Sequence, residues 1–199
     1  MAAVFAGEEQ VAALLREEDG AVSLAAVNGP REVVISGRAE RVKAVRGRLR
    51  EEGVATQELA VSRAFHSALM RPMVGALEKA AREARYEPAR LPVISTVTGK
   101  KAGREELARA EYWSGQVGAT VRFGAAAEAL AEEGVRVFLE VGATPILTGL
   151  AKRSVNAKDR VFFGSLKRGE EDEEQMARTV AGLYAQGLEV DWTGFRGGP

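Results

Sequence analysis

Apolar and polar positions follow two different rhythms along the first sixty residues. Residues 8–18 and 39–52 have the spacing of amphipathic helices, and Val42, Val45 and Leu49 form the apolar stripe of the second one. Short apolar runs bounded by turn residues predict strands at residues 2–6, 22–27, 32–35 and 55–61. The order strand, helix, strand, strand, helix, strand is typical of the ferredoxin-like β-α-β-β-α-β motif.

The rhythm changes after residue 66, where longer elements alternate. Helices are predicted at residues 67–86, 123–134, 146–153 and 171–186, and strands at residues 91–96, 135–141 and 161–163. Leu69, Met73 and Leu77 are expected on the buried side of the first helix, and residues 135–141 are apolar enough for a buried parallel strand. Residues 112–117 fit either element. Alternating strands and helices indicate an α/β protein with a parallel sheet and crossover helices.

Composition excludes several classes of protein. The 199 residues carry 28 basic and 28 acidic side chains, which argues against a nucleic-acid surface or a polybasic membrane patch. No apolar run approaches the ~20 residues needed to span a bilayer, and the first residues lack the features of a signal peptide. Cysteine is absent, so neither disulfides nor thiolate metal sites are expected. These features favour a cytoplasmic protein with no metal cofactor.

One histidine, His66, is the strongest candidate for chemistry. It follows a predicted strand and precedes a long helix, the place where α/β proteins put reactive groups. A helix N-terminus disfavours imidazolium, so the ring is expected to accept a proton from a hydroxyl nucleophile. Ser67 is interpreted as the cap of that helix. A structural role for a lone histidine stays the alternative.

No partner for such a base is found in the chain. None of the serines lies in a Gly-x-Ser-x-Gly turn, the strained strand-to-helix turn that exposes a nucleophilic hydroxyl. Residues 142–145 follow a strand and precede a helix but lack the lysine and glycine spacing of a phosphate loop, so they are interpreted as a tight turn. No acidic or histidine cluster has metal-ligand spacing.

Four stretches together resemble the acyltransferase domains of modular polyketide synthases and the malonyl-CoA:acyl-carrier-protein transacylases. Residues 62–70 (Ser-Arg-Ala-Phe-His-Ser-Ala-Leu-Met) resemble the family's histidine motif. Residues 25–37 resemble the paired strands of its small subdomain, and Tyr112-Trp113 with Val121-Arg122-Phe123 resembles the segment before a late helix. Glu140-Val141-Gly142 resembles its Glu-Val-Gly-Pro turn, with Ala143 in place of the proline.

The resemblance implies transfer of a malonyl unit from coenzyme A to the phosphopantetheine thiol of an acyl carrier protein. A serine ester is the intermediate, His66 is the base, and a backbone carbonyl orients its ring. Asn28, Arg63, Ala64 and Phe65 are implied at the substrate. The sequence Arg63-Ala64-Phe65-His66 is similar to the malonyl-selective His-Ala-Phe-His, whereas Tyr-Ala-Ser-His accompanies methylmalonyl. A core aromatic role is the alternative for Phe65. Coenzyme A enters as substrate, and no cofactor is implied.

The resemblance also implies a division of the chain and a missing part. Residues 1–62 correspond to the ferredoxin-like small subdomain, residues 63–187 to part of the parallel-sheet, α/β-hydrolase-like core, and residues 188–199 to a following linker. The nucleophile turn and the arginine that pairs with the malonyl carboxylate belong upstream of Met1. We therefore expect the chain to be inactive without an N-terminal half or a larger synthase.

Two other functions stay open at this point. A non-catalytic docking or scaffold module derived from an acyltransferase would use the small subdomain as a carrier-protein surface and would not need His66. A ferredoxin-like regulatory domain that binds an amino acid would need neither the histidine motif nor the Glu140-Val141-Gly142 turn.

Overall fold

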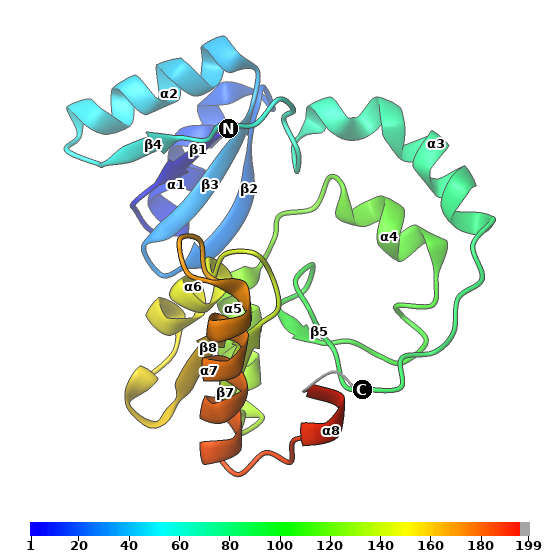
Figure 1. Ribbon diagram of the computed structural model, residues 1–199. Helices are drawn as coiled ribbons and strands as arrows, with labels where there is room; N and C mark the ends of the chain where they lie inside the picture. The colour runs from blue at the N-terminus through cyan, green and yellow to red at the C-terminus, as the bar shows by residue number, and fades with distance from the viewer. Residues whose placement is uncertain (196–199) are drawn as a thin grey trace. The chain divides into compact units, whose positions relative to one another are not determined.

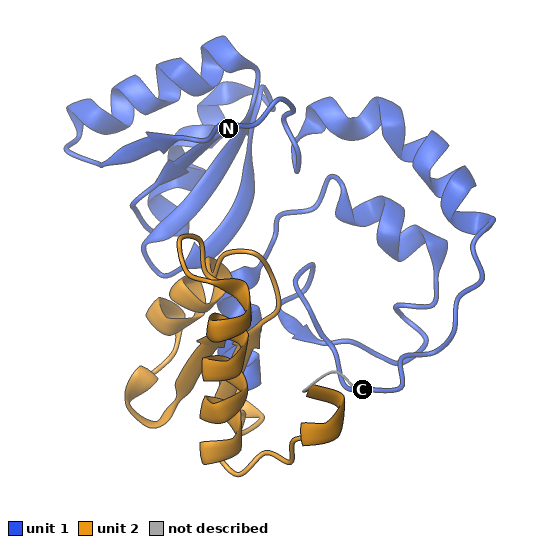
Figure 2. Cartoon of the chain, in the orientation of Figure 1, with its two compact units in different colours: residues 1–130 blue, residues 131–199 orange. Residues whose placement is uncertain are grey.

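The computed structural model describes residues 1–195 and divides into two compact units, Met1–Leu130 and Ala131–Pro199 (Figure 2). Helices and strands occur in both units, which confirms the α/β class. None of the described helices combines the length and the apolar composition that a membrane crossing requires. The borders expected at residues 62 and 187 concern subdomains of a family fold and stay predictions.

The first unit opens with a four-stranded antiparallel sheet and two helices (Figure 1). The elements are β1 (Ala2–Val4), α1 (Glu8–Leu15), β2 (Val22–Gly29), β3 (Glu32–Gly37), α2 (Ala39–Glu51) and β4 (Thr56–Glu58). The strand order is β2-β3-β1-β4, so β3 separates β1 from β2 and β1 separates β3 from β4. Each β-α-β unit is therefore split by one strand, as the ferredoxin-like interpretation requires.

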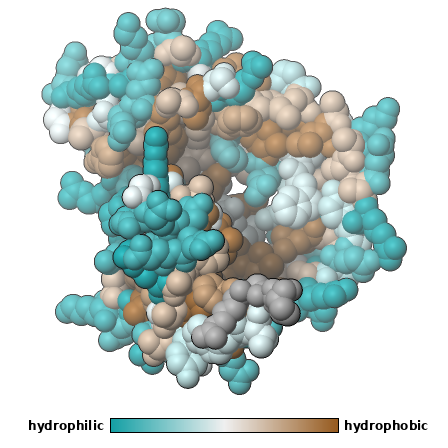
Figure 3. All heavy atoms as spheres, viewed as in Figure 1, coloured by the Kyte–Doolittle hydropathy of each residue, from teal (hydrophilic) through white to brown (hydrophobic). Residues whose placement is uncertain are grey.

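The core of this sheet lies on one face, beneath both helices. Alternate residues of β1 and β3 point to it, including Val4, Val33 and Ile35, all fully buried. Val42, Val45 and Leu49 of α2 pack into the same cluster, which confirms the predicted stripe. Hydrophilic side chains cover the outer side of α2 (Figure 3). Burying each such aliphatic side chain contributes about 1.5–3 kcal/mol.

The long helix expected over residues 67–86 is shorter and begins differently. A 3-10 turn, η2 (Ala68–Met70), precedes α3 (Arg71–Arg82), because Pro72 lacks an N–H and fits only the first turn of an α-helix. Leu69 and Met73 were expected to be buried but are 47% and 40% exposed. The apolar stripe is present, but α3 packs mainly on α4 (Ala110–Gln116). Residues 112–117, which fitted either element from the sequence, thus lie mostly in a helix.

The strand expected at residues 91–96 is reduced to a two-residue pair. β5 (Ile94–Ser95) is antiparallel to β6 (Lys100–Lys101). Gly99 turns the chain between them at φ +70°, a conformation that glycine adopts without strain. The apolar run before β5 is therefore a poor guide to its length, since Leu91 is 77% exposed.

The second unit contains the predicted parallel pair. β7 (Val137–Glu140) and β8 (Val161–Gly164) are parallel, and α6 (Leu147–Ser154) lies between them in the chain. The helix before this pair is α5 (Phe123–Glu132), which crosses the border between the units, and the helix after it is α7 (Asp172–Ala185). Phe138 is buried, but Leu139 is 44% and Val141 is 81% exposed. The expectation that residues 135–141 are buried throughout is wrong in this structure, because the two-stranded sheet leaves part of β7 uncovered.

The expected linker at residues 188–199 includes a short helix, α8 (Trp192–Phe195). The Asp191 carboxylate accepts hydrogen bonds from the backbone N–H groups of Thr193 and Gly194, both at 3.1 Å, as an N-cap does. Bonds from the Thr193 hydroxyl and from these N–H groups lower the pKa of Asp191. Residues 196–199 lie outside the described residues.

Glu140 at the end of β7 caps the start of α6. Its Oε1 accepts from the Ile146 N–H at 3.0 Å, and its Oε2 accepts from the Thr148 N–H at 2.8 Å and hydroxyl at 3.1 Å. Burial acts to raise the pKa of Glu140, but the N–H groups of Thr148, Leu147 and Ile146 outweigh it and hold the pKa below its ordinary value. The Glu-Val-Gly turn is thus a strand-to-helix junction held by an anion at a helix N-terminus.

We expect Glu140→Gln to lower the free energy of unfolding by about 1 kcal/mol, the usual cost of weakening a cap. Because the folded pKa is lowered from 4.5, the stabilisation is full above that value and is lost as pH falls through the folded pKa. Urea unfolding at neutral pH and at a series of pH values below 4.5 measures both, and the gap between variant and wild type should narrow as the pH falls. Glu189→Gln, at an exposed position, serves as the control. An equal gap at all pH values would contradict the account.

A second prediction concerns Gly37 at the end of β3. A Cβ there would lie 2.8 Å from Val22 Cα and closer still to the Ala21 carbonyl oxygen, and neither backbone atom can rotate away. We expect Gly37→Ala to lower the free energy of unfolding by about 1–3 kcal/mol. Gly47→Ala is the matched control, because its Cβ meets nothing within 4 Å inside α2 and should stabilise by roughly 0.5–1 kcal/mol. Thermal unfolding that moves both variants the same way would refute the packing argument.

Candidate active site

His66 lies in the loop between β4 and η2, in a conformation that few residues adopt. Its φ is +57°, in the left-handed region that is uncommon for residues other than glycine, although asparagine, aspartate and histidine adopt it more often than the rest. Its backbone N–H donates to the Val117 carbonyl oxygen at 3.1 Å. Such strained positions cluster at functional sites and persist only where the surroundings hold them. The segment after α4 is one such support.

The same segment holds the imidazole ring. His66 Nδ1 lies 2.9 Å from the Ala119 carbonyl oxygen. Since a carbonyl oxygen can only accept, Nδ1 is the donor and carries the proton. In the neutral ring Nε2 is then left as an acceptor, directed away from this bond. The residue is only partly buried, so the ring is not sealed among packed side chains.

The turn that follows His66 is fixed by a buried serine. Ser67 is 3% exposed, its hydroxyl donates to the Ala64 carbonyl oxygen at 2.6 Å, and it accepts from the Leu69 N–H at 3.3 Å. The Ala68 N–H in turn donates to the hydroxyl of Ser23 in β2 at 3.4 Å. Ser67 is therefore a cap, as predicted, although the turn that it caps is η2 and not an α-helix. This turn holds the histidine loop against the small sheet.

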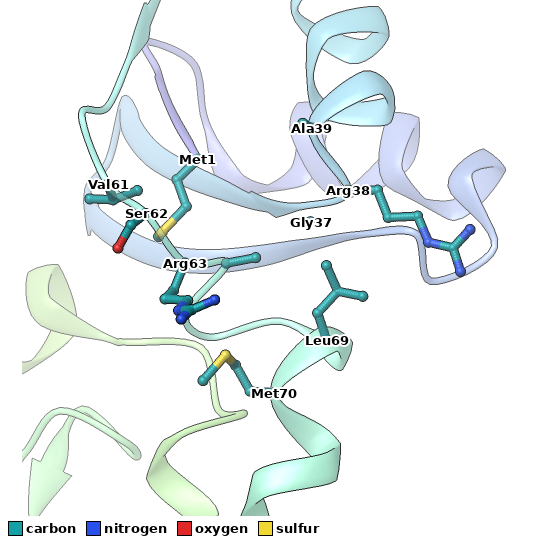
Figure 4. Close-up of a pocket in the computed structure, with 10 residues that line it drawn as sticks. Met1, Gly37, Arg38, Ala39, Val61, Ser62, Arg63, Leu69 and Met70 are labelled. Carbon is teal, nitrogen blue, oxygen red and sulfur yellow. The ribbon is translucent and has the colours of Figure 1, made fainter.

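Two of the residues implied at the substrate line a pocket next to this loop. Arg63 and Ala64 contribute to a cavity of about 400 Å³ between the small sheet and η2. The Arg63 side chain lies between those of Met1 and Met70, whereas that of Arg38 extends away from them (Figure 4). The structure gives Arg63 no ion-pair partner among residues 1–195. An unpaired guanidinium beside the loop can attract an anionic group.

Phe65 and Asn28 take different positions. Phe65 is 46% exposed within the described part of the chain. Asn28 lies in β2, four residues beyond Leu24, whose carbonyl accepts from Thr120 next to Ala119. At the rise of a strand this separation is roughly 13 Å. The structure therefore groups Arg63, Ala64, Phe65 and His66 in one loop, whereas Asn28 lies in β2.

The sequence failed to identify the partner of the histidine ring. A backbone carbonyl was expected, but the oxygen of Ala119 comes from a residue 53 positions later in the chain. The only sequence signal was indirect, because the recognised run Val121-Arg122-Phe123 follows Ala119 closely. Among residues 1–195, no group of three or more His, Asp or Glu side chains is placed to hold a metal ion.

Comparisons with known proteins identify the family of the chain. Residues 1–190 match the family described as the acyl transferase domain. The chain is 40% identical over its whole length to the polyketide synthase GfsB of Streptomyces halstedii, of which it covers 4%. It is 38% identical over 98% of its length to the spectinabilin polyketide synthase system protein NorB of Streptomyces orinoci, of which it covers 9%.

Solved structures give the same answer at the level of the fold. The acyltransferase domain from the second module of the salinomycin polyketide synthase superposes with a TM-score of 0.92 at 37% identity, over all of this chain and 46% of that domain. The malonyl CoA-acyl carrier protein transacylase of Clostridium perfringens gives a TM-score of 0.82 at 26% identity, over 94% of this chain and 57% of that protein. The chain thus spans about half of the solved domains and a small part of the curated relatives. With the match to the family over residues 1–190, these similarities show that the chain belongs to the acyl transferase domain family.

Proposed function

We propose that this chain forms part of an acyltransferase that moves a malonyl unit from malonyl-CoA to the phosphopantetheine thiol of an acyl carrier protein. The observation that carries the proposal is the 2.9 Å hydrogen bond from His66 Nδ1 to the Ala119 carbonyl oxygen. It leaves Nε2 as the proton acceptor that a hydroxyl nucleophile requires. Membership of the acyl transferase domain family supports the reaction class.

In the proposed reaction, Nε2 of His66 accepts the proton of a serine hydroxyl while the serine oxygen attacks the thioester carbonyl carbon. The carbon–sulfur bond then breaks, and the thiolate of coenzyme A takes the proton back from the imidazolium. In the second half the carrier-protein thiol loses its proton to Nε2 and attacks the serine ester, and the serine oxygen recovers that proton on leaving. The Ala119 carbonyl stabilises the imidazolium of each half-reaction through Nδ1–H.

The serine in this scheme comes from polypeptide outside the 199 residues. No Gly-x-Ser-x-Gly turn occurs among them, so the chain alone is expected to form no acyl-enzyme. A carrier protein and a coenzyme A thioester are the partners that the reaction requires. The proposal needs no metal or other cofactor, because base, nucleophile and thioester complete the proton and acyl transfers.

Phe65 is proposed to select the acyl unit. Its side chain is 46% exposed and lies one residue before the base. A phenyl ring at this place would occupy the volume that an α-methyl substituent needs, whereas a serine would leave it open. One methyl group in a fitted pocket is worth only ~1–3 kcal/mol, so the expected result is a preference for malonyl.

The base is tested by His66→Asn, in a reaction that supplies the missing part. The chain is mixed with, and in parallel fused to, the part of the salinomycin acyltransferase domain that it does not match, and malonyl transfer to a carrier protein is followed by mass spectrometry. Asparagine tolerates a positive φ, and its amide can still donate toward the Ala119 carbonyl, but it accepts no proton. We expect transfer by the wild type and a loss of about 10²–10⁴-fold in the variant.

The outcomes separate the competing functions. Undiminished transfer by the His66→Asn variant would exclude this ring as the base. No transfer by the wild type, either mixed or fused, would reject acyl transfer and support a docking or scaffold module derived from an acyltransferase.

Selectivity is tested by Phe65→Ser in the same assay with malonyl-CoA and methylmalonyl-CoA in competition. The methylmalonyl-to-malonyl product ratio should rise roughly ten- to two-hundred-fold, because the substitution opens space for one methyl group. Phe5→Ser is the matched control, since Phe5 is 42% exposed and lies at the end of β1, away from the histidine loop. A product ratio that is the same for both variants would show that Phe65 does not set the preference.

A further inference from the structure

The carbonyl that holds the histidine ring belongs to a short strand-like segment on the edge of the small sheet. The Val121 N–H donates to the Ala25 carbonyl oxygen at 2.9 Å, and the Val27 N–H donates to the Val121 carbonyl oxygen at 2.8 Å. Val121 thereby pairs with Ala26 of β2 in parallel. This is a single bridge and not a full strand, so backbone hydrogen bonds tie the segment to β2 at Val121 only.

Thr120 supplies an anchor beside Ala119. Its hydroxyl donates to the Leu24 carbonyl oxygen at 2.7 Å, across 96 positions of the chain. Leu24 lies in β2 next to Ser23, whose hydroxyl accepts from the turn that follows His66. Both sides of the bond between His66 and Ala119 are therefore tied to neighbouring residues of one strand. A β-branched threonine adds to this restraint, because its χ1 angle is stiff.

A second anchor closes the far end of the segment. Arg122 Nη1 donates to both carboxylate oxygens of Glu8, at 2.6 and 2.7 Å, and its N–H donates to the Thr96 carbonyl oxygen at 2.6 Å. Both side chains of the ion pair are more than a third exposed, at 36% and 37%. An ion pair of that exposure contributes little, so the hydroxyl of Thr120, on the residue next to Ala119, is the more direct restraint on that carbonyl.

We propose that Thr120 is a positioning residue for His66. By fixing residues 119–121 on β2, its hydroxyl holds the Ala119 carbonyl in line with Nδ1 and so keeps the proton on that nitrogen. The role of this tautomer in catalysis rests on the proposed function, but the positioning of the Ala119 carbonyl by Thr120 does not. The hydroxyl of Thr120 bonds to Leu24 and not to the ring, and Thr120 does not line the pocket that includes Arg63 and Ala64, so we infer that it acts through the Ala119 carbonyl.

The test uses the ring as its own reporter, because His66 is the only histidine of the chain. Long-range ¹H–¹⁵N correlation spectra of the ¹⁵N-labelled chain at about pH 8.5, well above the ordinary imidazole pKa, show which ring nitrogen carries the proton. We expect the Nδ1–H tautomer in the wild type. In Thr120→Val, which keeps the shape and removes the hydroxyl, the ratio of Nδ1–H to Nε2–H should fall roughly fivefold, as loss of one hydrogen bond implies.

Two further variants make the result specific. Thr120→Ser keeps the hydroxyl and should restore the wild-type ratio. Thr179→Val removes another hydroxyl that donates to a backbone carbonyl at 2.7 Å, in the second unit, and should leave the ratio unchanged. Circular dichroism shows whether each variant is folded.

A wild-type ratio in a folded Thr120→Val chain would overturn the proposal, and so would a changed ratio that Thr120→Ser does not restore. Neither result depends on acyl transfer. Failure of the positioning role is therefore distinguishable from failure of the proposed function, which the His66→Asn assay tests separately.

Discussion

One hydrogen bond, from the ring of His66 to the backbone of Ala119, links the local structure of this chain to any chemistry it performs. The bond joins a loop after the small sheet to a segment that lies 53 residues further on. The left-handed backbone at His66 and the buried cap Ser67 set the position of the ring. The hydrogen bonds of Val121 to β2 set the position of the Ala119 carbonyl. A neutral carbonyl as acceptor fixes the tautomer without adding a charge beside the ring, unlike the carboxylate of a Ser-His-Asp triad.

The small sheet could be predicted from the sequence because its information is local. The stripe Val42, Val45 and Leu49 repeats at helical spacing, and the turn at Gly29-Pro30 separates two apolar runs, so periodicity and turn chemistry suffice. The histidine loop was found in the same way, from its place between a strand and a helix. The sequence could not identify Ala119 as the partner of the ring, because every residue has a backbone carbonyl oxygen. Only the three-dimensional path of the chain brings the carbonyl of Ala119 to Nδ1.

Burial was predicted least well for apolar side chains whose packing partners cannot be read from the sequence. An apolar pattern indicates which face of an element should be buried but not which element packs on it. Leu139 and Val141 were expected in a buried parallel strand, and Leu69 and Met73 on the buried side of a helix, yet all four are 40% exposed or more. The Glu-Val-Gly turn shows the complementary case. Its resemblance to a family turn gave no physical role for Glu140, and the anion cap on α6 emerged only from the three hydrogen bonds of that carboxylate.

The hydrogen bond at the centre of this account can be observed directly. In a chain labelled with ¹⁵N in His66 and ¹³C in the Ala119 carbonyl, a scalar coupling across the hydrogen bond joins the two nuclei only if Nδ1 donates to that oxygen. The structure predicts a measurable coupling together with a protonated Nδ1. No coupling, with the proton on Nε2 instead, would contradict the account, because Nε2 would then not be free to accept the proton of a hydroxyl nucleophile.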